Sequence, residues 1–105
     1  MPKVSVVVAA WNERAMIRDH IESFVRLRYP AKELVLCAGG PDGTYDITRA
    51  FASPDVLVLE QRPGEGKQRA LQHCLERVTG DIVFLTDADC LLNDEAFERT
   101  IAPIV

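Results

Sequence analysis

Short runs of aliphatic and β-branched residues recur along the chain, and longer stretches with apolar residues three or four positions apart separate them. Because every position of such a run is apolar, the runs predict strands that are buried on both faces. The spaced stretches predict helices with one apolar face. The predicted strands are Val4–Val8, Leu34–Cys37, Val56–Leu59 and Ile82–Leu85.

Residues that favour helix ends mark the segments between these strands. Asn12 is expected to cap a helix that continues to about Arg26. A helix of two turns is expected over Tyr45–Ala52, and Asn93 is placed to cap the last helix. Gly80 is expected to end the third helix as a left-handed cap residue. The apolar stripe of that third helix consists of Ala70, Leu71, Cys74, Leu75 and Val78.

This alternation of strands and helices predicts an α/β fold. We expect a Rossmann-like three-layer sandwich, in which helices cover a mainly parallel four-stranded sheet. The 105 residues are enough for a single domain spanning positions 1–105. The strand that ends at Leu85 has no later partner in the sequence, so it is expected to leave an open sheet edge.

Composition narrows the class of partner. The net charge of −4 and the absence of a basic cluster argue against nucleic acid. No apolar run approaches the ~20 residues that a membrane span needs. The three cysteines have no CxxC spacing and indicate a reducing compartment, with Cys37 and Cys74 as core residues. His20 and His73 lack a paired ligand and are expected at the surface or half buried.

The loops after the predicted strands carry the candidate chemistry, because ligands of such sheets bind at the carboxyl ends of the strands. Asp87 and Asp89 follow the fourth strand and are two positions apart, so they can share one divalent cation. Oxygen ligands suit Mg²⁺ or Mn²⁺. The alternative is that one aspartate caps the next helix while the other is solvated.

Two other loops contribute weaker signals. Lys67 follows a Gly-Glu-Gly turn at the start of a helix, where a diphosphate could bind, although a solvated lysine after a plain turn would look the same. Trp11, just after the first strand, could stack on a nucleobase or belong to the core. Glu13 could hold a sugar or base, or favour the helix dipole.

Taken together, these motifs resemble the family 2 glycosyltransferases with the GT-A fold. The family's first strand and Tyr-Asn-Glu turn correspond to 4–13, and its Asp-Gly-Thr turn to 42–44. Its Gly-x-Gly-Lys-x-x-Ala-Leu helix corresponds to 64–71, and its Asp-x-Asp motif to 87–89. The resemblance covers essentially the whole chain and implies a partial GT-A fold.

The resemblance implies that the chain binds a nucleotide-diphospho-sugar donor for transfer to an acceptor glycan or lipid. Asp87 and Asp89 would hold a divalent metal, Mg²⁺ or Mn²⁺, and Lys67 would lie near the phosphates. Trp11 would take the place of the family's base-stacking tyrosine, and Glu13 would help to seat the nucleoside. The implied donor-binding set is Ala9, Trp11, Glu13, Ala38, Lys67, Asp87, Ala88 and Asp89.

Three departures from the family pattern matter. Ala9 replaces a proline, and Cys37 and Ala38 replace paired acids, the second of which normally contacts the base. Inverting members also need a carboxylate base, which in the family lies well downstream of the Asp-x-Asp motif. We therefore expect no catalytic residue within these positions, and interpret the chain as a truncated donor-binding portion that is inactive alone.

The expected location is the cytoplasm or the cytoplasmic face of a membrane. The alternative function is a non-catalytic module of the same fold, which binds a nucleotide sugar or associates with itself through the open sheet edge.

Overall fold

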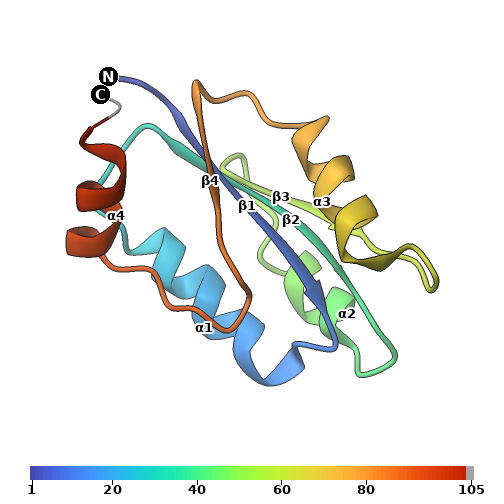
Figure 1. The fold of residues 1–105 in the computed structure, drawn as a ribbon. Coiled ribbons are helices and arrows are strands. Elements are labelled where there is room, and N and C mark those ends of the chain that lie inside the picture. The colour runs from blue at the N-terminus through green and yellow to red at the C-terminus, as the bar shows by residue number, and fades with distance from the viewer. Residues whose placement is uncertain (104–105) are drawn as a thin grey trace.

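The computed structural model describes residues 1–103 and confirms the α/β fold (Figure 1). Strands and helices alternate along the whole described chain. The strands are β1 (Val4–Trp11), β2 (Lys32–Gly39), β3 (Val56–Glu60) and β4 (Ile82–Leu85). The helices are α1 (Arg14–Val25), α2 (Thr44–Arg49), α3 (Gly66–Leu75) and α4 (Asp94–Ile101).

The four strands form one parallel sheet in the order β3-β2-β1-β4. Val7 of β1 is in register with Val35 of β2 on one side and with Leu85 of β4 on the other. The chain thus proceeds outward from β1 to β3 and then returns to pair β4 with the free side of β1. The carboxyl ends of β1 and β4 meet where this direction reverses, which is where open α/β sheets bind ligands.

Helices cover the two faces of the sheet unequally. On one face, α1 and α4 close the main core, in which Phe24, Phe97 and Val6 are at most 2% exposed. α2 lies on the same side (Figure 1). On the other face α3 packs against β1 and β2, where Cys37 and Cys74 are fully buried. Their predicted role as core residues is confirmed.

The first helix begins differently from the prediction. β1 continues to Trp11 because the Asn12 amide donates to Gly39 O at 3.0 Å and extends the ladder with β2. Asn12 has a positive φ of 57° and turns the chain, so Glu13 occupies the position before the helix and makes no side-chain cap. The prediction that Asn12 caps α1 is therefore wrong. By contrast, Asn93 does cap α4, accepting the Ala96 amide at 2.8 Å.

Gly80 also has a different role from the predicted one. α3 ends at Leu75, and Gly80 is outside the group of glycines with positive φ. A Cβ on Gly80 would lie 2.5 Å from Ser5 Oγ and 2.7 Å from Lys3 O. Glycine is therefore needed here for its small size, because the segment before β4 passes against the start of β1.

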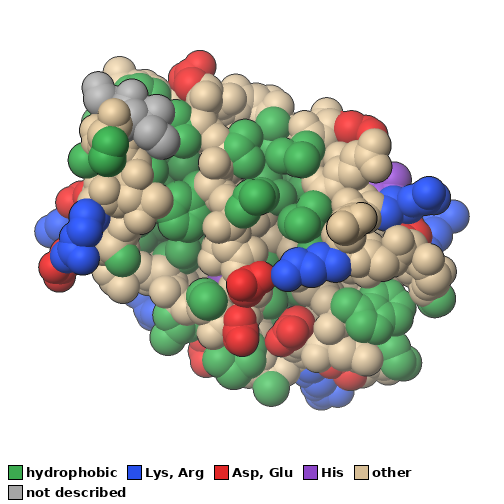
Figure 2. All heavy atoms as spheres, viewed as in Figure 1, with side chains coloured by type: hydrophobic (Ala, Val, Ile, Leu, Met, Phe, Trp, Pro, Cys, Tyr) green, Lys and Arg blue, Asp and Glu red, His purple; other side chains and the backbone are tan. Residues whose placement is uncertain are grey.

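The side of β4 that faces α3's layer is left open. Val83 is 42% exposed and Leu85 is 61% exposed, since α3 lies over β1 and β2 instead. Figure 2 shows hydrophobic side chains gathered in the middle of this view, above a group of acidic and basic side chains. Within residues 1–103, no helix has the length and apolar character that crossing a bilayer requires.

Candidate functional site

A cavity of about 740 Å³ lies at the carboxyl ends of β1 and β4, beside the start of α3. It brings together segments that are far apart in the sequence: the end of β1, the loop before α3 and the loop after β4. Its lining residues are Ala9, Trp11, Glu13, Gln61, Arg62, Gly64, Gly66, Lys67, Asp87, Ala88 and Asp89.

This lining includes seven of the eight residues that the sequence marked for donor binding. They are Ala9, Trp11, Glu13, Lys67, Asp87, Ala88 and Asp89. The eighth, Ala38, is fully buried in the main core and does not line the cavity. The seven residues therefore lie around one cavity, and their role in donor binding stays a prediction.

The loop after β4 is held in place by its central residues. Ala88 is 4% exposed and belongs to the main core, so the two flanking aspartates are left at the surface. The Cys90 amide donates to Asp87 O at 3.0 Å and closes a turn. The Leu92 amide donates to Ser23 Oγ at 2.9 Å, which fastens the loop to α1. Two carboxylates are thus presented from an anchored backbone.

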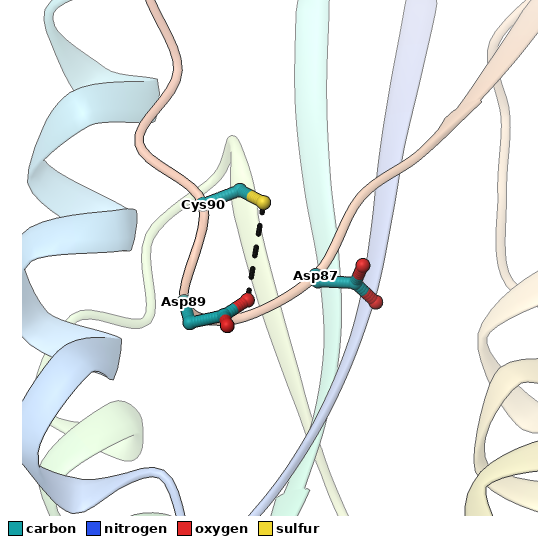
Figure 3. A group of neighbouring side chains, drawn as sticks. All are labelled: Asp87, Asp89 and Cys90. Atoms are coloured by element: carbon teal, nitrogen blue, oxygen red, sulfur yellow. Dashed lines mark hydrogen bonds between the residues drawn. The ribbon is translucent and has the colours of Figure 1, made fainter.

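Asp87, Asp89 and Cys90 each offer a ligand atom, and these atoms all lie within 4.8 Å of one another. Figure 3 shows the three side chains on one turn, with Asp89 extending toward the segment that carries Asp87. Cys90 Sγ donates to Asp89 Oδ1 at 3.8 Å. The two carboxylates are oxygen donors of the kind that Mg²⁺ and Mn²⁺ prefer, whereas a thiol is a softer ligand. The donor set therefore fits a hard divalent ion held by Asp87 and Asp89.

Lys67 reaches this cluster from the first turn of α3. Its Nζ lies 3.0 Å from Asp87 Oδ1, and both side chains are more than 60% exposed. The lysine reaches this place because Gly64 and Gly66 adopt φ values of 85° and 80°, a region that side chains disfavour. A cation and two carboxylates thus share one rim of the cavity.

Glu65 stabilises the turn that carries Lys67. Its Oε1 accepts the Arg62 amide at 2.6 Å, and its Oε2 lies 2.8 Å from His73 Nε2. The hydrogen bond from the Arg62 amide, followed by the one from His73, lowers the pKa of the Glu65 carboxyl. Glu65 therefore stays ionised and acts on the loop rather than in the cavity.

His20, on α1, is fully buried, against the expectation of a surface or half-buried position. Neither ring nitrogen has a hydrogen-bond partner within the described residues. Burial lowers the pKa of His20 to about 4, and the nearby Asp89 carboxylate only partly opposes this shift. The ring is therefore neutral at physiological pH.

The sequence did not single out Gln61 and Arg62, although both line the cavity. Gln61 also lines a second cavity of about 490 Å³, and Trp11 is shared between the two. The sequence feature that could have identified Gln61 is its position, because it directly follows β3 at the same sheet edge. A Cβ on Gly39 would overlap Gln61 O and approach Trp11 Cζ3 at 3.1 Å, so the wall between the cavities is closely packed.

Known proteins resemble this chain in sequence over most of its length. The model of the family described as glycosyl transferase family 2 matches residues 5–105. EpsE of Bacillus subtilis (strain 168) is 30% identical, with 96% of this chain and 38% of EpsE aligned. The poly-β-1,6-N-acetyl-D-glucosamine synthase of Staphylococcus epidermidis is 28% identical, with 89% of this chain and 23% of that protein aligned.

A solved structure shares the fold as well. The mannosyltransferase PcManGT from Pyrobaculum calidifontis, in complex with GDP-Man and Mn²⁺, superposes with a TM-score of 0.77 at 34% identity. The match covers 86% of this chain and 28% of that one, so the chain spans well under half the length of these relatives. On the family match, the relatives and the fold, the chain belongs to glycosyl transferase family 2.

Proposed function

We propose that these residues bind the nucleoside diphosphate part of a sugar donor, together with a divalent metal, for transfer of the sugar to a glycan or lipid acceptor. The observation that carries the proposal is the cavity of about 740 Å³ in which Asp87, Asp89 and Lys67 meet. The solved mannosyltransferase with GDP-Man and Mn²⁺ supports a donor and a metal of this kind.

The metal would be held by Asp87 and Asp89. Their carboxylates fit Mg²⁺ or Mn²⁺, and the position of Lys67 Nζ, 3.0 Å from Asp87 Oδ1, supports a site for positive charge beside Asp87. When bound, the ion would supply positive charge beside the diphosphate and thereby stabilise the departing nucleoside diphosphate.

The cavity offers further groups to the donor. Lys67 and Arg62 are the cationic side chains on its lining and would contact phosphate oxygens. Lys67 also stands in the first turn of α3, where free backbone N–H groups favour an anion. Trp11 and Glu13 line the side nearer to β1, where a base or ribose would lie.

The transfer step needs more than these groups. A carboxylate that deprotonates the acceptor is expected from the family resemblance, as is inversion at the sugar carbon. This chain spans 38% or less of the relatives described above. We therefore propose donor binding for the described residues, and transfer for the whole protein.

Calorimetric titration with UDP and GDP in the presence of Mn²⁺ or Mg²⁺ tests this proposal. We expect binding that requires the ion and that weakens at least tenfold in Asp89→Asn, because one of two carboxylate ligands becomes a neutral amide. Asp55→Asn, which changes an exposed aspartate in the turn before β3, is the matched control and should bind as the wild type does. Equal binding with and without the ion, or no effect of Asp89→Asn, would contradict the proposal.

A further inference from the structure

The turn between β3 and α3 contains two glycines that packing does not hold in place. Gly64 and Gly66 have φ values of 85° and 80°, in the region that side chains disfavour. Apart from its chain neighbours, a Cβ at either glycine would meet no described atom within 4 Å. Glycine also has the most backbone freedom to lose. Other bonds are therefore needed to keep this turn in one conformation.

Glu65, between the two glycines, supplies such bonds within the turn. Its amide donates to Arg62 O at 3.3 Å, and its Oε1 accepts the Arg62 amide at 2.6 Å. The two residues thus bond to each other in both directions. This reciprocal pair closes the turn over residues 62–65.

His73 connects the closed turn to the packed part of α3. Its Nε2 lies 2.8 Å from Glu65 Oε2, and a protonated Nε2 donates to that carboxylate. His73 stands in the last turn of α3, next to Cys74, which is fully buried against β1 and β2. The carboxylate of Glu65 therefore joins the glycine-containing turn to a part of the helix that the core holds in place.

Glu65 and His73 lie outside the cavity proposed for the diphosphate. Both line a third cavity, of about 430 Å³, and neither belongs to the lining of the 740 Å³ cavity. Lys67, two residues after Glu65, does line the 740 Å³ cavity, and its Nζ lies 3.0 Å from Asp87 Oδ1. An effect of Glu65 or His73 on a ligand in that cavity would pass through the backbone that carries Lys67.

We propose that Glu65 and His73 are positioning residues, which hold the start of α3 so that Lys67 meets the diphosphate. A backbone that is already fixed loses less conformational freedom when the ligand binds, so the affinity is higher. The inference rests on the proposed function, because it assumes that the diphosphate binds beside Lys67.

Calorimetric titration of the chain with inorganic pyrophosphate in Mg²⁺ tests the role of His73. His73→Leu removes the N–H donor and should weaken pyrophosphate about fivefold, the effect of one lost hydrogen bond. His73→Gln keeps an N–H donor of similar reach and should restore affinity to within about twofold of the wild type. Gln72→Leu, which changes an exposed polar residue on the same helix, is the matched control and should bind as the wild type does.

A double-mutant cycle with Lys67 distinguishes positioning from a general loss of stability. If His73 acts through Lys67, His73→Leu should weaken pyrophosphate by less than about twofold once Lys67 is already methionine, because the two residues share one effect. Thermal melts of each variant establish that it is folded. Amide hydrogen exchange should show that the Arg62 amide exchanges faster in His73→Leu than in the wild type, since its acceptor is no longer held.

The outcomes separate this inference from the proposed function. If the wild type binds pyrophosphate in Mg²⁺ and folded His73→Leu binds it equally well, the positioning role is wrong and the donor site stands. The same conclusion follows if His73→Gln fails to restore affinity, or if the effects of His73→Leu and Lys67→Met add in full. If the wild type binds neither pyrophosphate nor a nucleoside diphosphate in Mg²⁺ or Mn²⁺, the proposed function is wrong and this inference is wrong with it.

Discussion

Lys67 and Asp87 form an ion pair between side chains that are both largely exposed, with Nζ and Oδ1 3.0 Å apart. Water screens such a pair, and it contributes about 1 kcal/mol or less to folding. Lys67 is therefore expected to contribute to ligand binding more than to folding, since its charge lies at the cavity beside the start of α3.

Replacing Lys67 by methionine tests this division. We expect Lys67→Met to weaken pyrophosphate binding in Mg²⁺ by about tenfold, the effect of one charge-assisted hydrogen bond, while the free energy of unfolding changes by less than about 1 kcal/mol. Calorimetry and urea unfolding measure the two quantities. Arg99→Met is the matched control, because it removes a surface ion pair with Glu95 that is far from the cavity. A large loss of stability without loss of binding would contradict the assignment.

The buried His20 predicts a pH dependence of stability. Its pKa is about 4 in the folded chain, against about 6.5 when unfolded, so the unfolded state takes up the proton first as pH falls. Stability should therefore fall from pH 6.5 down to about 4. From the ~1.36 kcal/mol per unit of pKa difference, the loss between pH 7.5 and 5 is about 2 kcal/mol.

Urea unfolding in EDTA at these two pH values measures the effect. His20→Leu keeps an apolar side chain in the core and should show a much smaller difference between the two pH values. The lowered pKa values of Glu33, Asp42 and Glu65 affect stability only at more acidic pH, so they do not mask it. An unchanged pH dependence in His20→Leu would show that another group is responsible.

Sequence patterns located some of these residues and not others. Two of the site's segments could be placed from the alternation of strands and helices along the chain. Asp87 and Asp89 follow a strand and Lys67 opens a helix, so their meeting at one sheet edge was predictable. The burial of His20 could not be predicted, because it depends on how α1 packs in the tertiary structure. Gln61 was likewise missed, because nothing in the sequence shows that it lines both cavities.

At the scale of elements, side chains from distant segments fix the ends of helices and strands. The amides at the start of α1 donate to the start of α2 and to the loop before it. Glu13 N donates to Thr44 Oγ1 at 3.0 Å, and Arg14 N donates to Asp42 Oδ2 at 3.1 Å. Hydrogen bonding from outside the helix replaces the predicted Asn12 cap. The spacing of apolar residues was therefore enough to predict that this segment is a helix. The residue at which the helix begins was not predictable, because it depends on a tertiary contact.

Glu33 performs a similar task at the other end of the sheet. Its carboxylate accepts hydrogen bonds from Ser5 Oγ at 2.6 Å, from Thr79 N at 2.7 Å and from Thr79 Oγ1 at 2.9 Å. The Lys3 Nζ atom lies 3.5 Å from the same carboxylate. Burial raises the pKa of Glu33, but these hydrogen bonds outweigh it and leave the pKa below its ordinary value. One side chain thus joins β2, β1 and the segment before β4.

We expect Glu33→Gln to lower the free energy of unfolding at pH 7 by about 1–3 kcal/mol, because hydrogen bonds to a charged group are lost. The stability that Glu33 provides is present above pH 4.5 and should disappear as pH falls through its lowered folded pKa. Thermal or urea unfolding across this range measures it. Glu98→Gln, which affects only a surface contact with Arg28, should change stability by less than about 0.5 kcal/mol. Equal effects of the two substitutions would contradict the role of Glu33.

At the scale of the whole molecule, β3 and β4 are the edge strands of the sheet that residues 1–103 form, and β4 carries exposed apolar side chains. These side chains are Val83 and Leu85, at 42% and 61% exposure. Exposed apolar groups on an edge strand favour pairing with another chain. The prediction of self-association from the sequence rests on the same strand and stays a prediction.

Light scattering at increasing concentration tests it. We expect reversible self-association of these residues at micromolar concentration, which the double substitution Val83→Thr and Leu85→Thr should suppress. Leu75→Thr is the control, because Leu75 is 47% exposed on α3 and lies outside the edge strand. A monomer at all concentrations, or suppression by Leu75→Thr alone, would count against association through β4.

We propose above that a divalent ion and a nucleoside diphosphate bind together at the loop after β4. Paramagnetic broadening of amide signals by substoichiometric Mn²⁺, with a nucleoside diphosphate present, locates the ion directly. We predict that the amides of residues 86–90 broaden first, followed by those around Lys67, and that Asp89→Asn abolishes this pattern. Broadening centred instead on the cavity between β3 and α3 that Glu60, Glu65 and Glu76 line together with Arg62, His73 and Arg77, with the loop after β4 unaffected, would contradict this placement.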